Sequence, residues 1–190
     1  MAFPATSELE HAVRTDVALD FETLVRLYRP KVFRFALASL RDVDAAETVT
    51  QDCFLRAYQA RGRFRADCGI QTWLMQIAVN LVRDHYRNRR FQFWRRASLT
   101  AVTPADAAGR SIADGARSPE AQALLKEQVA AIWEAAGKLP ERQRTVFLLR
   151  FVEDMDLLEI ACATGMKEGT VKTHLFRALR AVRARLGGTA

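Results

Sequence analysis

The chain has 190 residues, of which 49% are hydrophobic, so it can form one domain or two small domains with packed cores. Its net charge of +7 and pI near 9.8 favour an acidic partner, either nucleic acid or an anionic membrane surface. No apolar run approaches the ~20 residues of a spanning helix, and the N-terminus lacks the apolar core of a secretory signal. Scattered cysteines without a CxxC pair argue against a disulfide scaffold, and we expect a cytoplasmic protein.

Helical periodicity dominates the N-terminal part, and no segment alternates as a strand would. Residues 1–20 are expected to form a disordered tail. A first helix is predicted from Phe21 to about Leu40, and Pro30 should kink or restart it.

The next two helices are predicted from their caps and apolar faces. Asp44 and Glu47 have the spacing of a capping box at the start of a helix. Residues 61–69 form a predicted loop, and Thr72 could cap a third helix. The predicted inner face of the second helix carries Ala46, Val49, Cys53, Phe54 and Ala57. That of the third carries Trp73, Leu74, Ile77, Ala78, Leu81 and His85.

Residues 97–119 are rich in Ala, Ser, Thr, Gly and Asp and predict a flexible linker. Helix returns near Glu120, and Pro140 suits the first turn of the following helix. The predicted buried faces of these two helices carry Leu125, Val129, Ile132, Trp133 and Ala136, then Val146, Phe147, Leu149 and Phe151. The predicted fold is therefore all-α, with two small helical domains joined by the linker.

The C-terminal segment from Leu157 to Phe176 has the layout of a helix-turn-helix: a short helix, a tight turn and a second helix. Gly165 can take the left-handed conformation that ends the first helix. Side chains suited to fill the angle between the helices are Ile160, Ala161, Met166, Val171 and Leu175.

The second helix of this motif predicts contact with duplex DNA, because its N-terminal residues would face base edges in the major groove. Arg177 and Arg180 lie further along the helix, where contact with phosphates is expected. The alternative is a solvated basic face on a helical bundle. The N-terminal residues concerned are Lys167, Glu168, Thr170, Lys172, Thr173 and His174.

Arginines and aromatic residues crowd the stretch before the predicted linker. Arginines supply salt-dependent phosphate affinity, and aromatic rings stack on unpaired bases, so the mixture suits single-stranded or melting DNA. Alternatively, the aromatics pack on their own domain or form a docking patch. The residues are Arg83, Tyr86, Arg87, Arg89, Arg90, Phe91, Phe93, Trp94, Arg95 and Arg96.

Catalysis finds little support in the sequence. No glycine-rich phosphate loop occurs, and Cys53, Cys68 and His85 lack the closely spaced ligand pair of a metal site. Cys53 and Cys162 are expected to be small buried residues. We therefore expect no enzyme activity, no cofactor and no metal.

Both halves of the chain resemble parts of one family. Region 2 of the bacterial sigma-70 family resembles the segment TVTQDCFLRAYQARGRFRADCGIQTWLMQIAVNLVRDHYRNRR. Region 4 resembles the segment LPERQRTVFLLRFVEDMDLLEIACATGMKEGTVKTHLFRALRAVRARL. The chain is most similar to the extracytoplasmic-function group of sigma factors. The resemblance implies a dissociable promoter-recognition subunit of RNA polymerase, with region 2 in residues 21–96 and region 4 in residues 120–187.

The resemblance also implies site residues. Region 4 would read the minus-thirty-five promoter element through the eight residues from Lys167 to Arg180 named above. Region 2 would capture the melted minus-ten element, where a flipped base enters a pocket. The residues carried over for this task are Arg63, Arg65, Asn80, Arg83, Asp84, Arg87 and Arg90.

Binding to core RNA polymerase would fall on Glu47, Thr48, Gln51 and Asp52. The family motif Asp-Leu-x-Gln-Glu maps onto residues 48–52, where Thr48 replaces Asp and Asp52 replaces Glu. The implied partners are core RNA polymerase, promoter DNA and an anti-sigma factor, often membrane-anchored, with no small-molecule substrate. Two alternatives remain: a stand-alone helix-turn-helix regulator and, last, a nucleic-acid enzyme.

Overall fold

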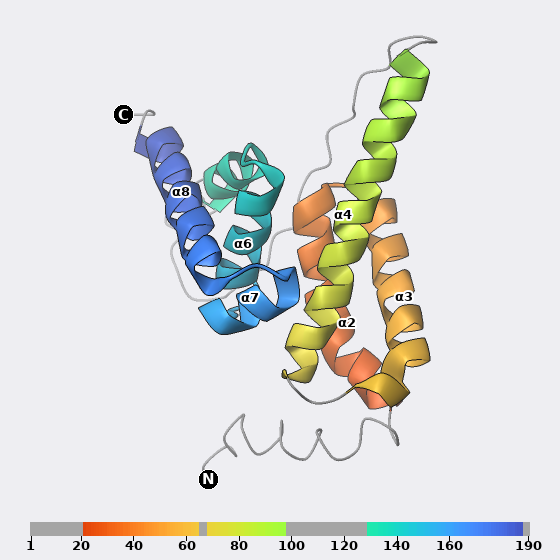
Figure 1. The fold of residues 1–190 in the computed structure, drawn as a ribbon. Coiled ribbons are helices and arrows are strands. Elements are labelled where there is room, and N and C mark those ends of the chain that lie inside the picture. Colours follow the sequence, from red (N-terminus) through yellow and green to blue (C-terminus); the bar gives the residue numbers. More distant parts are fainter. Residues whose placement is uncertain (1–20, 65–67, 98–128, 188–190) are drawn as a thin grey trace, which may run out of the picture.

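The computed structural model describes residues 21–64, 68–97 and 129–187, and for Arg63 and residues 89–97 it describes the backbone alone. Within these ranges every regular element is helical, which confirms the predicted all-α class, and the helices form two groups (Figure 1). The first group contains α2 (Phe21–Leu40), α3 (Val43–Ala60), the short 3-10 helix η1 (Arg61–Arg63) and α4 (Ile70–Ala97). The second contains a helix over residues 129–137, α6 (Glu141–Phe151), α7 (Leu157–Thr164) and α8 (Glu168–Leu186).

The start of α3 differs from the prediction. Asp42, not Asp44, is the N-cap: its backbone is extended, with φ −141° and ψ 118°, and its side chain accepts a hydrogen bond from the Ala45 backbone N–H. Asp44 lies in the first turn, where a negative charge favours the positive end of the helix dipole. The inner face of α3 is buried as predicted.

Helix α2 has the predicted bounds, from Phe21 to Leu40, and it continues through Pro30 without a restart. Another prediction about the start of a helix is wrong. Helix α4 begins before Thr72, because the Trp73 N–H already donates to the Gly69 carbonyl at 3.0 Å. Thr72 is instead fully buried inside the helix.

The second group buries a different set of side chains from those predicted. In α6 the prediction is confirmed for Val146, Phe147 and Leu149, but Phe151 is exposed and lies against the Phe147 ring at 4.9 Å between centroids. In the helix over residues 129–137 the small Ala135 and Ala136 are buried and belong to the apolar core. The predicted inward residues Val129, Ile132 and Trp133 are exposed, whereas Ala136 is inward as predicted.

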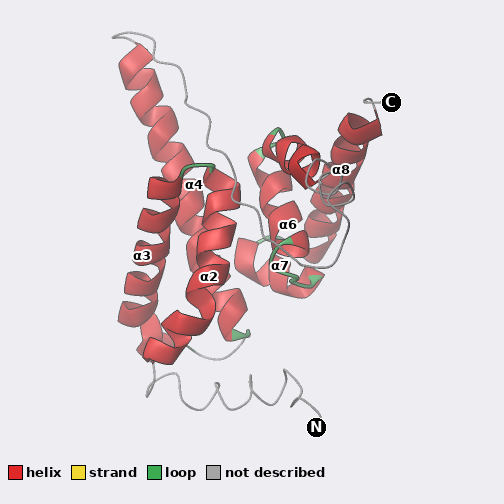
Figure 2. Ribbon diagram, turned by 180° about the vertical axis from the view of Figure 1, so that it is seen from behind, coloured by secondary structure: helices red, strands yellow, loops and turns green. Residues whose placement is uncertain are grey.

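Helix α4 lies between the two groups and is buried on two sides (Figures 1 and 2). One stripe, which includes Leu74 and Ala78, packs toward α2 and α3. A second stripe, containing Met75, Val79 and Val82, is equally buried, and α7 packs along α4. The sequence prediction missed this stripe because it treated the two domains as separate.

Several predictions lie outside the described residues. These are the tail over residues 1–20, all of the predicted linker except Ala97, Leu125, and the side chains of Arg63, Arg65, Arg89, Arg90, Phe91, Phe93, Trp94, Arg95 and Arg96. Ala97 is the last residue of α4.

The turn between α7 and α8 depends on one glycine. Gly165 ends α7 with φ 70°, in the left-handed region that residues with a Cβ adopt at a cost. This confirms the conformation expected from the sequence.

We predict that Gly165→Ala lowers the free energy of unfolding by about 1 kcal/mol, because alanine is strained at positive φ. Gly169→Ala is the matched control. Residue 169 lies inside α8 with open space where a Cβ would be, so this change should raise the free energy of unfolding by about 0.5–1 kcal/mol through helix propensity. Chemical denaturation measures both, and effects of the same sign would contradict the account of the turn.

Candidate nucleic-acid and polymerase interfaces

The helix-turn-helix predicted between Leu157 and Phe176 is formed. A capping box fixes the start of α7: the Asp156 carboxylate accepts from the Glu159 N–H, and the Glu159 carboxylate accepts from the Asp156 N–H, both at 2.8 Å. Ile160 and Val171 are fully buried between the helices, with Met166 packed against them. The angle between α7 and α8 is therefore set by capping, a left-handed turn and a small apolar core.

The outward face of α8 carries the predicted DNA-binding side chains. Lys172 lies 2.6 Å from Glu168, and the Thr173 hydroxyl donates to the Gly169 carbonyl. The exposed members of the predicted set are Lys167, Thr170, Lys172, Thr173, Arg177 and Arg180, while Glu168 and His174 are half-buried. The structure thus gathers all eight residues on one helix and its N-cap, with a cationic surface open to solvent.

Phe176 lies on the same outward surface and is 67% exposed. The sequence analysis missed it as a surface residue. The signal was present, because placing Leu175 inward turns the next residue outward on a helix. An exposed aromatic ring beside arginines gives this face an apolar contact in addition to its charge.

His174 is half-buried on α8. Its Nδ1 atom is buried and has no hydrogen-bond partner among the described residues. Desolvation lowers the pKa of His174, and the neighbouring charges of Arg142 and Arg177 lower it further. The lowered pKa favours the neutral imidazole at neutral pH.

A second cationic surface runs along α4. Asn80, Arg83, Asp84 and Arg87 follow one another at spacings of three and four residues, which places them on one side of the helix. The Arg83 guanidinium donates to the Asn80 side-chain oxygen at 3.3 Å, and Arg87 pairs with Asp84 at 3.1 Å. Asn80, Arg83 and Arg87 are exposed.

A cavity of about 310 Å³ lies beside Arg83, between α4 and the turn of the helix-turn-helix. Its walls include Val79 and Val82 from α4, Arg142 from α6 and Gly165 from the turn. The two predicted DNA-binding surfaces are therefore neighbours in space.

The third candidate surface is the outward side of α3. Thr48, Gln51 and Asp52 are exposed, as a binding role requires, while Glu47 is half-buried and pairs with Arg29 at 2.7 Å. The Thr48 hydroxyl donates to the Asp44 carbonyl within the helix.

Two large apolar side chains extend this surface of α3, and the sequence analysis missed both. Leu55 is 55% exposed and Tyr58 is 47% exposed. Their signal in the sequence was their position off the inner face carried by Cys53, Phe54 and Ala57. Leu55 and Tyr58 therefore add apolar area beside the polar residues predicted to bind core polymerase.

Among the described residues, no group of His, Cys, Asp or Glu side chains could hold a metal ion. Cys53 is buried, and burial raises the pKa of its thiol to about 12. Cys162 is exposed, so the prediction that it would be buried is wrong: it lies on the outer side of α7, whereas Ile160 and Ala163 face inward.

None of the described helices is long and apolar enough to span a membrane.

Comparison with known proteins distinguishes the sigma-factor interpretation from the two alternatives left open by the sequence. The model for sigma-70 region 2 matches residues 24–92, and the model for sigma-70 region 4 matches residues 130–182. The ECF RNA polymerase sigma factor SigW of Bacillus subtilis is 30% identical over 166 residues, covering 87% of this chain and 88% of the relative. The chain belongs to the extracytoplasmic-function group of sigma-70 factors.

Two further comparisons agree. The RNA polymerase sigma-H factor of Pseudomonas aeruginosa is 33% identical to this sigma factor over 165 residues, covering 85% of the chain and 83% of the relative. The sigma factor RpoE of Bartonella quintana, solved in complex with the anti-sigma factor NepR, has the same fold. Its TM-score is 0.70 over 88% of this chain and 97% of that chain, at 21% identity. Sigma factors act in transcription initiation and are not enzymes.

We predict that His174 makes the stability of this sigma factor depend on pH. Its pKa is lowered in the folded state, so the unfolded chain takes up the proton first as the pH falls below about 6.5. The contribution is complete above that value and is lost as the pH falls toward the folded pKa. Denaturation at pH 7.5 and pH 5.5 should show a smaller loss of stability for His174→Gln than for wild type. Equal losses would contradict the assignment.

Proposed function

We propose that this sigma factor binds core RNA polymerase and directs initiation at promoters through two separate DNA-binding surfaces, one in residues 21–96 and one in residues 120–187. The observation that carries the proposal is the pairing of an exposed cationic helix-turn-helix with a second exposed cationic helix face in one member of the sigma family. A stand-alone duplex binder has no need of the second surface.

Region 4 is proposed to place α8 in the major groove at the minus-thirty-five element. Lys167, Thr170 and Thr173 lie at the exposed N-terminal end, where recognition helices meet base edges. Arg177 and Arg180 lie one and two turns further, where guanidinium groups can bind phosphates. The Glu168–Lys172 pair must loosen for Lys172 to bind DNA, so Glu168 reduces the non-specific affinity of this end.

Region 2 is proposed to hold the melted minus-ten element along α4. The Asn80 amide is a donor and an acceptor and suits the edge of an unpaired base. Arg83, which donates to Asn80, would orient that amide while Arg87 neutralises a phosphate. Arg63, Arg65 and Arg90 complete the surface proposed from the sequence.

Core RNA polymerase is proposed to bind the outward side of α3. Gln51 and Asp52 supply polar contacts, and Leu55, one turn after Gln51, supplies the apolar contact. Glu47 and Thr48 flank them toward the start of the helix. Glu47 partly compensates for the carboxylate that the family motif has at position 48, where this chain has Thr. The ion pair with Arg29 partly neutralises the charge of Glu47.

An anti-sigma factor is proposed to control the protein in the cytoplasm, and any membrane anchor would belong to the chain of that partner. The solved relative RpoE was crystallised with an anti-sigma factor, and an inhibitor of this kind must cover surfaces that polymerase or DNA requires. Co-expression with the neighbouring genes tests the proposal: recovery of a fully active protein that purifies with none of their products would contradict it.

We predict that Lys172→Ala together with Arg177→Ala weakens promoter-dependent transcription about tenfold or more. The two changes remove two cationic groups, each worth about 1 kcal/mol or less in high salt and more in low salt. The slope of log affinity against log salt should fall by about 0.9 for each phosphate that the variant no longer neutralises. Arg183→Ala, on the exposed C-terminal part of α8, is the matched control. Unchanged transcription from the double variant would exclude α8 as the recognition helix.

We predict that Gln51→Ala together with Asp52→Ala weakens association with core polymerase and leaves DNA binding by α8 intact. The changes remove exposed polar groups and touch no buried side chain. Gln59→Ala, exposed two turns further along α3, is the control. Competition for core polymerase and duplex binding are measured in parallel, and a loss of duplex binding with normal polymerase association would reverse the duties assigned to the two regions.

A further inference from the structure

The cavity beside Arg83 has walls from three parts of the chain. One wall belongs to α4, a second to the first turns of α6, and a third to the turn that follows α7. Its volume of about 310 Å³ reaches the range of small-molecule pockets, which begins at roughly 300 Å³. Pockets of that kind combine an apolar surface with a few polar groups. The chemistry of the walls therefore indicates what the cavity can bind.

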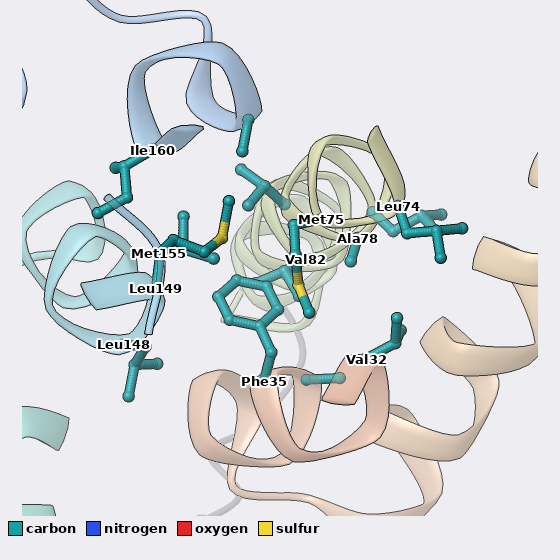
Figure 3. Packing of buried hydrophobic residues seen from close by; sticks show 14 of the residues in the cluster. Val32, Phe35, Leu74, Met75, Ala78, Val82, Leu148, Leu149, Met155 and Ile160 are labelled. Carbon is teal, nitrogen blue, oxygen red and sulfur yellow. The ribbon is translucent and has the colours of Figure 1, made fainter. Parts of the chain in front are cut away.

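One side of the cavity is apolar. Val79 and Val82 of α4 line it, and each is only 3% exposed. Val82 also belongs to the packed core around α4 (Figure 3). Met166, half-buried after the turn, lines the cavity as well. A ligand with an apolar body is favoured here, because it replaces water against these side chains.

Two guanidinium groups give the cavity its positive charge. Arg83 of α4 donates to the neutral side chain of Asn80 at 3.3 Å, a contact that leaves its charge in place. Arg142 of α6 lies in the opposite wall. Among the described residues, neither arginine forms an ion pair. Guanidinium groups bind carboxylates and phosphates through charge-assisted hydrogen bonds, so the pair suits an anionic group.

The other polar groups of the wall are acceptors. The Thr145 hydroxyl donates to the Glu141 carbonyl at 3.0 Å, and the Thr164 hydroxyl donates to the Ile160 carbonyl at 2.6 Å. Because a hydroxyl has one proton, these two oxygens can offer a ligand only lone pairs. The Glu141 carboxylate, also in the wall, is a further acceptor. It leaves the wall with one net positive charge, which favours a monoanion over a doubly charged phosphate.

We propose that this cavity is a binding site for a medium-chain hydroxy acid. The carboxylate binds Arg83 and Arg142, the alkyl chain lies against the apolar side, and the hydroxyl donates to a threonine oxygen or to Glu141. The site is independent of the proposed function, since it needs neither DNA nor polymerase. A consequence does rest on that function: a bound acid covers Arg83, which belongs to the surface proposed for the minus-ten element.

Calorimetric titration of the full chain with β-hydroxyoctanoate tests the site. Wild type should show saturable binding of one molecule. Arg83→Ala and Arg142→Ala should each weaken binding about tenfold, because each removes a charge-assisted hydrogen bond. Arg87→Ala is the matched control and should bind as wild type does. Arg87 is exposed one turn beyond Arg83 on α4, pairs with Asp84 and lies outside the cavity.

Related probes test each part of the ligand. The corresponding diol lacks the carboxylate and should bind about tenfold more weakly, and octanoate lacks the hydroxyl and should bind about threefold more weakly. Octyl phosphate should bind wild type more weakly than the acid does. Glu141→Gln should strengthen the binding of octyl phosphate, because it removes the negative charge of the wall.

Methyl NMR signals locate the bound acid. Those of Val79, Val82 and Met166 should shift as the calorimetric site fills. The proposal is overturned by any of three results: no saturable binding to wild type, an equal loss of affinity in Arg87→Ala and Arg83→Ala, or a diol that binds as tightly as the acid.

A single-stranded oligonucleotide should compete with the acid for wild type, because both require Arg83. Failure of the proposed function gives a different result: the acid binds and shifts the same methyl signals, but the oligonucleotide does not displace it. Calorimetry and methyl shifts therefore decide the acid site, and competition decides the role proposed for Arg83 in DNA binding.

Discussion

The burial of α4 on two sides is the constraint on which the rest of the structure depends. One stripe of the helix completes the core with α2 and α3, and the other is covered by the group that contains α7. Fully burying a side chain such as Met75 or Val82 is worth about 1.5–3 kcal/mol. The same helix exposes Asn80, Arg83 and Arg87. Helix α4 therefore links the stability of the packed chain to the placement of the surface proposed to bind DNA.

Helix α8 likewise has buried apolar residues on one side and exposed cationic residues on the other. Val171, Ala178 and Val182 are buried and fix the helix on α6 and α7. The cationic side chains remain exposed, so they keep their hydration and can attract phosphates in a salt-dependent way. His174 lies at the boundary and is kept neutral by desolvation and by the charges of Arg142 and Arg177. We propose that specific contacts and general attraction come from different residues of this helix.

Local rules were enough to predict much of this. The helix-turn-helix follows from Gly165 and from apolar residues at helical spacing, and the family follows from two segments in the right order. The rest depends on long-range contacts. Met75, Val79 and Val82 look like the flank of an amphipathic helix until α7 is placed beside them. Trp133 follows an apolar period but is exposed, whereas the smaller Ala135 and Ala136 are buried. Glu153 looks like an exposed loop acid until Arg34 reaches it from a position 119 residues away.

The role proposed for the two surfaces is to serve a polymerase, and run-off transcription measures that role. Core bacterial RNA polymerase is supplied with a library of candidate upstream regions, with and without this protein. The account predicts specific transcripts that require the protein and that share two upstream elements. Tight duplex binding by the protein alone, with no transcripts from core polymerase, would contradict it.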